Sequence, residues 1–264
     1  MPIRRVALWN CKSYWIELAT SSQDAANKFY ADLFGYQVNQ TPIGGGQLYT
    51  ILRLDGRDAA ACYTMMDDEK KMGIPPHWNL YVAVSSADES ARKAAELGGK
   101  IIAAPFDVMD AGRMAIVQDP TGAIFHLWQA NRSPGIGIAG VPGTLCWADL
   151  NTKDPERAKQ FYEALFGWTI SAGEKDPSGY LHIRNGDEFI GGMPPASMLD
   201  PNAPPHWLIY MFTEDAAATA NRAKDSGAKI LMPPMKIQDV GDMAVIADPQ
   251  GAVFALFSAT KATA

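Results

Sequence analysis

The sequence of 264 residues has few cysteines and no long hydrophobic run. Cys11, Cys62 and Cys146 lie far apart and form no C-x-x-C pair, which excludes a disulfide framework and a zinc ribbon. No segment approaches the roughly 20 consecutive apolar residues of a membrane span. The apolar run after Arg4 and Arg5 is too short for a signal-peptide core. We therefore expect a cytoplasmic protein with reduced thiols and no membrane partner.

Positive charge is also scarce. Lys and Arg number 23 against 29 Asp and Glu, giving a net charge of -6, and no stretch gathers the basic residues. This distribution excludes a nucleic-acid partner bound through a basic surface. Aromatic residues, by contrast, make up 10% of the chain, and there are 12 Met. They either pack the core or line an apolar cavity that binds a small molecule.

The chain repeats itself once. Residues 15–18 and 29–35 recur at an offset of 132, as residues 147–150 and 161–167. Pro-Pro-His-Trp at 75–78 and Asp-Pro-Thr-Gly-Ala at 119–123 recur at an offset of 129. Ordered matches at a near-constant offset indicate a duplication. We predict a first domain over residues 1–130, a Gly- and Pro-rich linker over 131–143, and a second domain over 144–264.

Each half contains two strand–helix–strand units by its residue pattern. Glycines end the expected helices, and Asp154 with Pro155 begins one of them. The strands expected in the first half are residues 14–18, 48–54, 59–65, 79–84, 114–118 and 124–129. Those expected in the second half are 180–184, 188–193, 207–213, 243–247 and 253–258. We expect loops at 41–47 and 197–205, and Gly191 with Gly192 predicts a close backbone approach within a strand.

The segments Phe-Tyr-x-x-Leu-Phe-Gly and Asp-Pro-x-Gly-Ala, within this repeated pattern, resemble the vicinal oxygen chelate (VOC) superfamily. That superfamily includes glyoxalase I, bleomycin-resistance proteins and extradiol dioxygenases. The resemblance covers nearly the whole chain and is nearest to tandem two-domain, glyoxalase/bleomycin-resistance-like members. It implies an α+β fold of two tandem VOC domains, each made of two βαβββ modules whose curved mixed sheets form a cup. Such a resemblance predicts a fold and leaves the reaction open.

The resemblance also implies positions at which a divalent metal would be held. These positions fall on Trp15, Asn79 and His126 in the first half and on Trp147, Leu208 and Ala255 in the second. An indole nitrogen only donates hydrogen bonds, so neither Trp can ligate a metal. Glu17 and His126 together supply two ligands, fewer than the three or four of a stable site. We predict no metal cofactor, with a divalent metal in the first domain as the alternative.

Strand alternation predicts which side chains face the cup. The candidate ligand-binding residues are Trp15, Asn79, Tyr81 and Trp128 in the first half, and Trp147, Asp149, Tyr210 and Phe257 in the second. The aromatic rings either fill the sheet interior or form the walls of a pocket. A buried carboxylate costs stability unless it is paired or meets a ligand, so Glu17 and Asp149 favour a binding site. A register shift of one residue would turn both acids outward.

Three functions agree with this pattern. The first is a metal-free protein that binds a small aromatic or cationic molecule. The second is a lyase or isomerase of glyoxalase type, in which Glu17 is the general base and His126 the acid or an orienting group. The third is a metal-dependent or dioxygenase-like enzyme. We expect the first half to be the reactive one, because Leu208 and Ala255 replace Asn79 and His126. Since fused halves can supply the pairing of modules, we expect a monomer or a weak homodimer.

Overall fold

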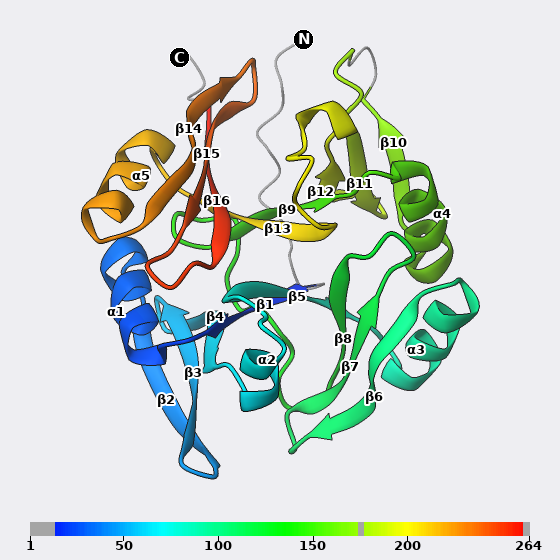
Figure 1. Ribbon diagram of the computed structural model, residues 1–264, viewed down its shortest axis with the longest axis horizontal. Helices are drawn as coiled ribbons and strands as arrows, with labels where there is room; N and C mark the ends of the chain where they lie inside the picture. The colour runs from blue at the N-terminus through cyan, green and yellow to red at the C-terminus, as the bar shows by residue number, and fades with distance from the viewer. Residues whose placement is uncertain (1–13, 174–176, 261–264) are drawn as a thin grey trace. The chain divides into compact units, whose positions relative to one another are not determined.

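The computed structural model describes residues 14–173 and 177–260 (Figure 1). The strands form two eight-stranded sheets of mixed direction, one from each repeat, so the predicted α+β class is confirmed. Their orders are β2-β3-β4-β1-β5-β8-β7-β6 and β10-β11-β12-β9-β13-β16-β15-β14. The four-stranded halves of each sheet are the four βαβββ modules. Among the described residues, every helix is too short or too polar to cross a membrane.

The first repeat contains two modules joined by a short helix. The first module comprises β1 (Tyr14–Thr20), α1 (Gln23–Phe34), β2 (Gln37–Gly44), β3 (Gln47–Leu54) and β4 (Arg57–Thr64), and α2 (Asp67–Lys71) follows it. The second comprises β5 (His77–Ala83), α3 (Ala87–Glu96), β6 (Lys100–Val108), β7 (Gly112–Gln118) and β8 (Ile124–Ala130).

The second repeat has the same order of elements. Its first module comprises β9 (Leu145–Asn151), α4 (Pro155–Phe166), β10 (Thr169–Ala172), β11 (Leu181–Asn185) and β12 (Glu188–Met193). A 3-10 turn, η1 (Ala196–Met198), follows. The last module comprises β13 (His206–Phe212), α5 (Ala216–Asp225), β14 (Lys229–Ile237), β15 (Gly241–Ala247) and β16 (Val253–Ala259).

The sequence pattern did not predict the outermost strands β2, β6, β10 and β14, and the loop expected at 41–47 is wrong. Residues 41–44 belong to β2, and Pro42 pairs with Leu48 of β3 in a hairpin. Nearly every residue of β2 is exposed. An edge strand that is exposed on both faces needs no alternation of apolar and polar residues, so the period-two signal is absent.

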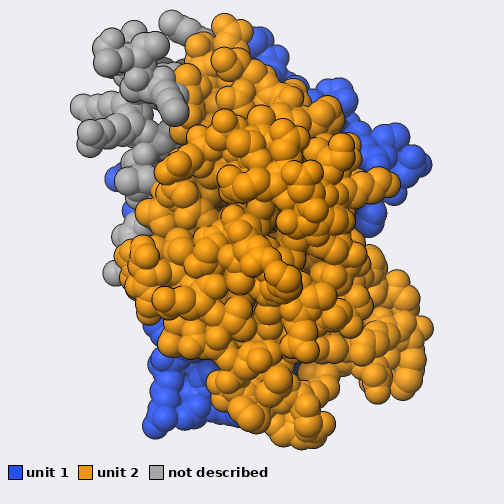
Figure 2. Space-filling view, turned by 90° about the vertical axis from the view of Figure 1, so that its left-hand side faces the viewer, with its two compact units in different colours: residues 1–15, 80–135, 147–208 blue, residues 16–79, 136–146, 209–264 orange. Residues whose placement is uncertain are grey.

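By packing, the chain divides into two compact units (Figure 2). The described part of unit 1 is residues 14–15, 80–135, 147–173 and 177–208. The described part of unit 2 is residues 16–79, 136–146 and 209–260. Each unit therefore draws modules from both repeats. The repeat boundaries at residues 130 and 144 stay a prediction.

Three repeated motifs meet inside unit 2. The Trp78 indole donates to the Tyr30 hydroxyl at 3.1 Å, and that hydroxyl donates to Asp248 Oδ2 at 3.0 Å. The other carboxylate oxygen, Oδ1, accepts the backbone N–H groups of Gln250, Gly251 and Ala252. Since Tyr30 is fully buried, its hydroxyl needs these partners. The Phe-Tyr, Pro-Pro-His-Trp and Asp-Pro-x-Gly motifs are therefore joined in one buried hydrogen-bonded triad.

Unit 1 contains the same triad with the repeats exchanged. Trp207 donates to Tyr162 at 3.1 Å, and Tyr162 donates to Asp119 Oδ2 at 2.9 Å. In unit 2 the Trp and the Tyr come from the first repeat and the Asp from the second; in unit 1 this is reversed. The motifs that recur most clearly in the sequence thus stabilise the packing of modules from different repeats.

The predicted linker is packed against neighbouring strands and helices. Gly137 donates its backbone N–H to Asp58 O at 2.7 Å, and a Cβ added to Gly137 would lie 3.1 Å from Asp58 N. At Gly143, φ is +86°, and an added Cβ would lie 3.2 Å from Phe34 O. The Tyr36 hydroxyl also donates to the carbonyl of Gly143. Glycine is required here both by backbone conformation and by close approach.

Candidate functional site

In unit 2, Glu17 of β1 is buried on the side of the sheet that faces away from α1. Thr50 of β3 accepts a hydrogen bond from Gln23 of α1, so Thr50 faces the helix and the neighbouring Tyr49 faces the opposite side. The Tyr49 hydroxyl donates to Glu17 Oε1 at 2.6 Å. Glu17 is only 7% exposed. The carboxylate therefore points away from bulk solvent, toward a tyrosine.

Tyr63 of β4 lies on the same face, because it pairs directly with Tyr49. Its hydroxyl donates to Glu69 Oε1 at 2.9 Å. Burial raises the pKa of Tyr63, and the nearby charges of Glu17 and Glu69 raise it further. The Asn79 amide lies near enough to the hydroxyl to lower that pKa in part. Four polar groups, from Glu17, Tyr49, Tyr63 and Asn79, are thus gathered on one face.

Asn79 of β5 is 94% buried, since its exposed fraction is 6%. The preceding residue, Trp78, points to the α1 side, where it meets Tyr30, so Asn79 points to the Glu17 side. Its amide is near enough to the Tyr63 hydroxyl to lower the pKa of that tyrosine. Within residues 14–173 and 177–260, however, Nδ2 meets no acceptor in hydrogen-bond geometry.

In unit 1, Asp149 of β9 is the counterpart of Glu17 and is 4% exposed. The Tyr180 hydroxyl donates to Asp149 Oδ1 at 2.5 Å. The Trp147 indole donates to the same Oδ1 at 2.7 Å and to the Tyr180 hydroxyl at 2.7 Å. A buried acid that accepts a hydrogen bond from a tyrosine therefore occurs in both repeats.

Different local packing allows each of the two acid–tyrosine pairs to form. Gly192 pairs with Asp149, and a Cβ added at Gly192 would overlap the Tyr180 hydroxyl. The missing side chain lets Tyr180 approach the short Asp149 side chain. In the first repeat Ala61 pairs with Glu17, whose side chain is one methylene longer. The predicted close approach is confirmed as well, because a Cβ at Gly191 would overlap the carbonyl of Ala148.

His182 of β11 adds an imidazole to the Asp149 side of unit 1. It pairs with Gly192, which in turn pairs with Asp149, so the three residues form a row across the sheet. Its ring packs edge-on against Tyr180, Phe189 and Trp147 at centroid distances of 5.1, 5.4 and 6.3 Å. The second repeat therefore holds a polar cluster, although the sequence favoured the first half as the reactive one.

The other predicted residues of unit 1 gather around His126 of β8, which is 5% exposed. Its ring lies 4.4 Å from the ring of Tyr81, which also contacts Trp128 at 6.2 Å. The Trp128 indole donates to Ser133 O at 2.9 Å, and its ring fills the space over Gly112. Trp15 is buried in this unit too. His126 thus belongs to unit 1, whereas Glu17 belongs to unit 2.

Tyr210 and Phe257 belong to unit 2, in the last module. Tyr210 pairs with Ala255, and the Phe257 ring packs 6.4 Å from Phe212 and over Gly241. Sequence alternation placed both aromatic residues without indicating a polar partner.

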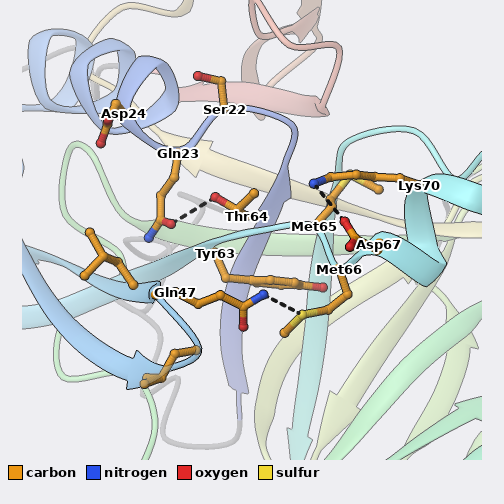
Figure 3. A pocket seen from close by; sticks show the side chains of 13 residues that line it. Ser22, Gln23, Asp24, Gln47, Tyr63, Thr64, Met65, Met66, Asp67 and Lys70 are labelled. Carbon is orange, nitrogen blue, oxygen red and sulfur yellow. Dashed lines mark hydrogen bonds and ion pairs between the residues drawn. The ribbon is translucent and has the colours of Figure 1, made fainter.

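A pocket of about 300 Å³ opens in unit 2 near the start of α1 (Figure 3). Thr64 donates to Gln23 across it at 3.1 Å, and Gln47 donates to the Met66 sulfur at 3.3 Å. Tyr63 lines this pocket and also lies close enough to Glu17 for that charge to raise its pKa. Tyr63 therefore links the pocket to the buried acid.

The described residues contain no group of three His, Cys, Asp or Glu side chains that could hold a metal ion. The first-strand position in the second repeat is filled by Trp147, whose nitrogen is committed as a donor to Asp149 and Tyr180. The donor set of the two acid–tyrosine pairs therefore does not fit a divalent metal.

This fold and these sites define the class of protein. The family model described as Glyoxalase/Bleomycin resistance protein/Dioxygenase superfamily matches residues 13–127 and 144–256. The chain belongs to this superfamily, with one VOC domain in each repeat, and is glyoxalase-like.

Particular relatives make the comparison more specific. The "Putative glyoxylase CFP32" of Mycobacterium tuberculosis is 41% identical over 92% of each chain. The "Anthracycline biosynthesis protein DauV" of a Streptomyces species is 30% identical, over 94% of this chain and 93% of the relative. Among solved structures, the Mn(II)-bound glyoxalase from Novosphingobium aromaticivorans covers 94% of this chain and 82% of its own, with a TM-score of 0.64 and 17% identity. The 2,3-dioxygenase LapB from Pseudomonas sp. KL28 covers 94% and 91%, with a TM-score of 0.60 and 14% identity.

Sequence reasoning missed Tyr49 and Tyr180, and it did not connect His182 with Asp149. One signal was present. A Tyr is followed four residues later by an Arg at 49–53 and again at 180–184, an offset of 131. That offset lies between the two offsets of the other repeated motifs and would have aligned both tyrosines with the acids.

Proposed function

We propose that the protein binds a small, partly aromatic or cationic molecule at its acid–tyrosine pairs, without a metal. The observation that carries this proposal is the repetition of the pair, Glu17 with Tyr49 and Asp149 with Tyr180. Both acids are more than nine-tenths buried. Burial of a carboxylate is costly, so a carboxylate that recurs at one place in a sheet is better explained by binding than by packing.

The surroundings of the pairs support a small-molecule site. Aromatic walls with a few convergent polar groups are typical of ligand pockets. In the second repeat Trp147 and Tyr180 supply aromatic surface beside Asp149, and Phe189 packs against the neighbouring His182. A carboxylate next to aromatic rings favours a cationic or hydrogen-bond-donating ligand.

The relatives support the aromatic part of this proposal. One of them is named for anthracycline biosynthesis, and anthracyclines are fused-ring aromatic compounds. The metal-free part rests on the donor set, because one oxygen of each carboxylate already accepts hydrogen bonds from an indole or a tyrosine. We expect metal analysis of the untagged, dialysed protein to find well below one equivalent of divalent metal; one equivalent would favour the metal-dependent alternative.

Calorimetric titration with tyramine, an aromatic cation, tests the binding function. We expect Glu17→Gln and Asp149→Asn each to weaken tyramine binding by about tenfold or more, as loss of one charge-assisted hydrogen bond predicts. Asp32→Asn is the control, since Asp32 is exposed and paired with Lys28. The neutral analogue 4-ethylphenol separates the charge from the ring. Wild-type protein that takes up neither probe would contradict the proposal.

A second candidate function is catalysis of glyoxalase type, because Glu17 is a buried carboxylate that could accept a proton from a substrate. Glu17 can act as general base toward a proton next to a carbonyl. His126, the acid or orienting group that the sequence suggested, belongs to unit 1 and takes no part in this proposal. The placement of Glu17 beside the Tyr49 hydroxyl favours this role, because a hydrogen bond to one carboxylate oxygen orients the other. Glu17→Gln should abolish turnover of the hemithioacetal of methylglyoxal; an unchanged rate would exclude Glu17 as the base.

A further inference from the structure

Asn79 is a buried polar side chain of unit 2 with an amide N–H for which the described residues supply no acceptor in hydrogen-bond geometry. It is more than nine-tenths buried, and within the described residues Nδ2 has no hydrogen-bond partner. An amide N–H that is removed from water without an acceptor costs free energy, and so such groups are rare. Its side chain points to the face of Glu17. The Tyr63 hydroxyl there donates to Glu69, and its oxygen is near enough to the Asn79 amide for the amide to lower the pKa of Tyr63, although the two groups do not meet in hydrogen-bond geometry.

We propose that Asn79 is a catalytic residue that donates a hydrogen bond to the oxygen of a carbonyl substrate while Glu17 removes the proton from the neighbouring carbon. The proposal rests on the proposed function, because the site must first bind a carbonyl compound. The hydrogen bond from Asn79 requires an acceptor on the ligand, such as a carbonyl oxygen. Glu17 by itself would require only a hydrogen-bond donor or a cation on the ligand. The substrate class is a small aldehyde or ketone with an acidic C–H next to the carbonyl.

The step balances without an oxidant or a co-reactant. A Glu17 carboxylate oxygen takes the proton, and the electron pair of the broken C–H bond forms a C=C bond. The carbonyl π pair moves to oxygen, which becomes an enolate and accepts the hydrogen bond from Asn79 Nδ2. The Glu17 carboxyl exchanges this proton with solvent, and return of a solvent-derived proton to the same carbon restores the carbonyl compound with its hydrogen exchanged. A donor fixed where negative charge develops lowers the barrier without a metal.

The second repeat provides an internal comparison. Leu208 occupies the position of Asn79, at an offset of 129, and has no hydrogen to donate. Asp149 corresponds to Glu17 but, lacking this donor, should bind without exchanging a proton. The proposal therefore places carbon–hydrogen chemistry in the first repeat and binding in the second.

Phenylacetaldehyde is a suitable probe, because it is neutral and aromatic and has acidic protons next to its carbonyl. Exchange of these protons into D2O is followed by NMR, and binding is measured separately by calorimetry. Asn79→Leu copies the second repeat, and Asn79→Asp keeps the size while removing both N–H groups, in case the apolar variant does not fold. Asn39→Leu, on the exposed strand β2, is the control.

We expect exchange to fall by about 100- to 1000-fold in both Asn79 variants, as in the loss of one oxyanion donor, with little change in affinity. Glu17→Gln should abolish exchange, while the control Asn39→Leu should leave it unchanged. Equal exchange in wild type and in the Asn79 variants overturns the role of Asn79. Wild-type protein that binds phenylacetaldehyde without exchanging it also overturns the inference but leaves the binding function standing. Failure of wild type to bind both phenylacetaldehyde and tyramine contradicts the proposed function itself.

Discussion

Gly192 shows how a single hydrogen in place of a side chain shapes the second acid–tyrosine pair. Gly192→Ala would place a methyl group where the Tyr180 hydroxyl lies, so we expect the Tyr180–Asp149 hydrogen bond to break. Overpacking and the lost bond together should destabilise the fold by about 1–3 kcal/mol. Urea unfolding measures this change. Ala61→Gly, the reverse change in the first repeat, should cost only about 0.5–1 kcal/mol; equal effects would contradict the account.

Asp248 gives a pH dependence whose sign follows from its burial. Burial raises the pKa of this carboxyl above the ordinary Asp value, although hydrogen bonds from backbone N–H groups and from Tyr30 partly oppose the shift. The folded protein therefore keeps this proton to a higher pH than the unfolded chain does. The contribution of Asp248 to stability is fully present below the unfolded pKa, about 3.9, and is lost as pH rises through the folded value.

Replacement of this carboxyl by an amide should remove that dependence. We expect Asp248→Asn to flatten the stability curve between about pH 4 and the folded pKa, measured by urea unfolding at a series of pH values. Asp32→Asn, an exposed site, serves as the control. If the curves of wild type and Asp248→Asn run parallel, the carboxyl does not titrate as its burial implies.

For single residues, the sequence predicted the side of the sheet to which a side chain points, because side chains alternate along a strand. Alternation predicted that Glu17 and Asp149 each point to the inner face of their own sheet, and both side chains are buried. It could not supply Tyr49 or Tyr180, because a partner on another strand depends on the register between strands. The register in turn depends on hairpins and bulges, such as the one between Ile183 and Arg184, that leave little trace in a single sequence.

At the scale of elements, the connection between the repeats makes specific demands on its glycines. Gly143→Ala places a side chain at a φ of +86° and against Phe34. We expect a loss of about 1–3 kcal/mol in urea unfolding, from backbone strain and from the contact together. Gly186→Ala is the matched control, since its φ is +59° and an added Cβ meets nothing within 4 Å. A loss as large at Gly186 would mean that strain alone accounts for the effect.

Elements with a buried face were predicted well, and those at sheet edges were not. The helix ending at Gly35 and the strands beside it carry apolar residues at regular spacing. Strands β6 and β14 contain prolines and alternate between exposed and half-buried residues along much of their length. Pro cannot donate to a ladder and is tolerated at an edge, so these segments resemble loops in sequence.

At the scale of the whole molecule, the two triads predict how the chain responds to division. Residues 1–143 contain Tyr30 and Trp78 without Asp248, and residues 144–264 contain Tyr162 and Trp207 without Asp119. We expect neither fragment to be a stable monomer, because a buried tyrosine would lose its acceptor. Co-expressed, the two fragments should form a one-to-one complex, detectable by size-exclusion chromatography with light scattering.

A fragment that pairs with a second copy of itself would also agree with the triads. Asp119 can replace Asp248 if two copies of residues 1–143 pair, so a homodimer of this fragment fits the same interactions. Tyr30→Phe should weaken either assembly. A folded, monomeric fragment would show that the triads do not control the packing.

The order of the repeats was predictable from two constant offsets, but the grouping of modules was not. Offsets show which segments are equivalent, and equivalent segments can pack with their own repeat or with the other one. The hydrogen bond from Tyr30 to Asp248 spans 218 residues, a separation that no periodicity reports. Only contacts between motifs, seen in coordinates, distinguish these arrangements.

The position of the triads also bears on how such proteins diverge. The Trp, Tyr and Asp groups hold the α1 side of the sheet in unit 2, whereas Glu17 and Asn79 lie on the other side. Changes at the second side leave the framework's own hydrogen bonds intact. A duplicated ancestor could therefore keep one backbone while its two copies acquired separate chemical specialities, as the replacement of Asn79 by Leu208 already illustrates.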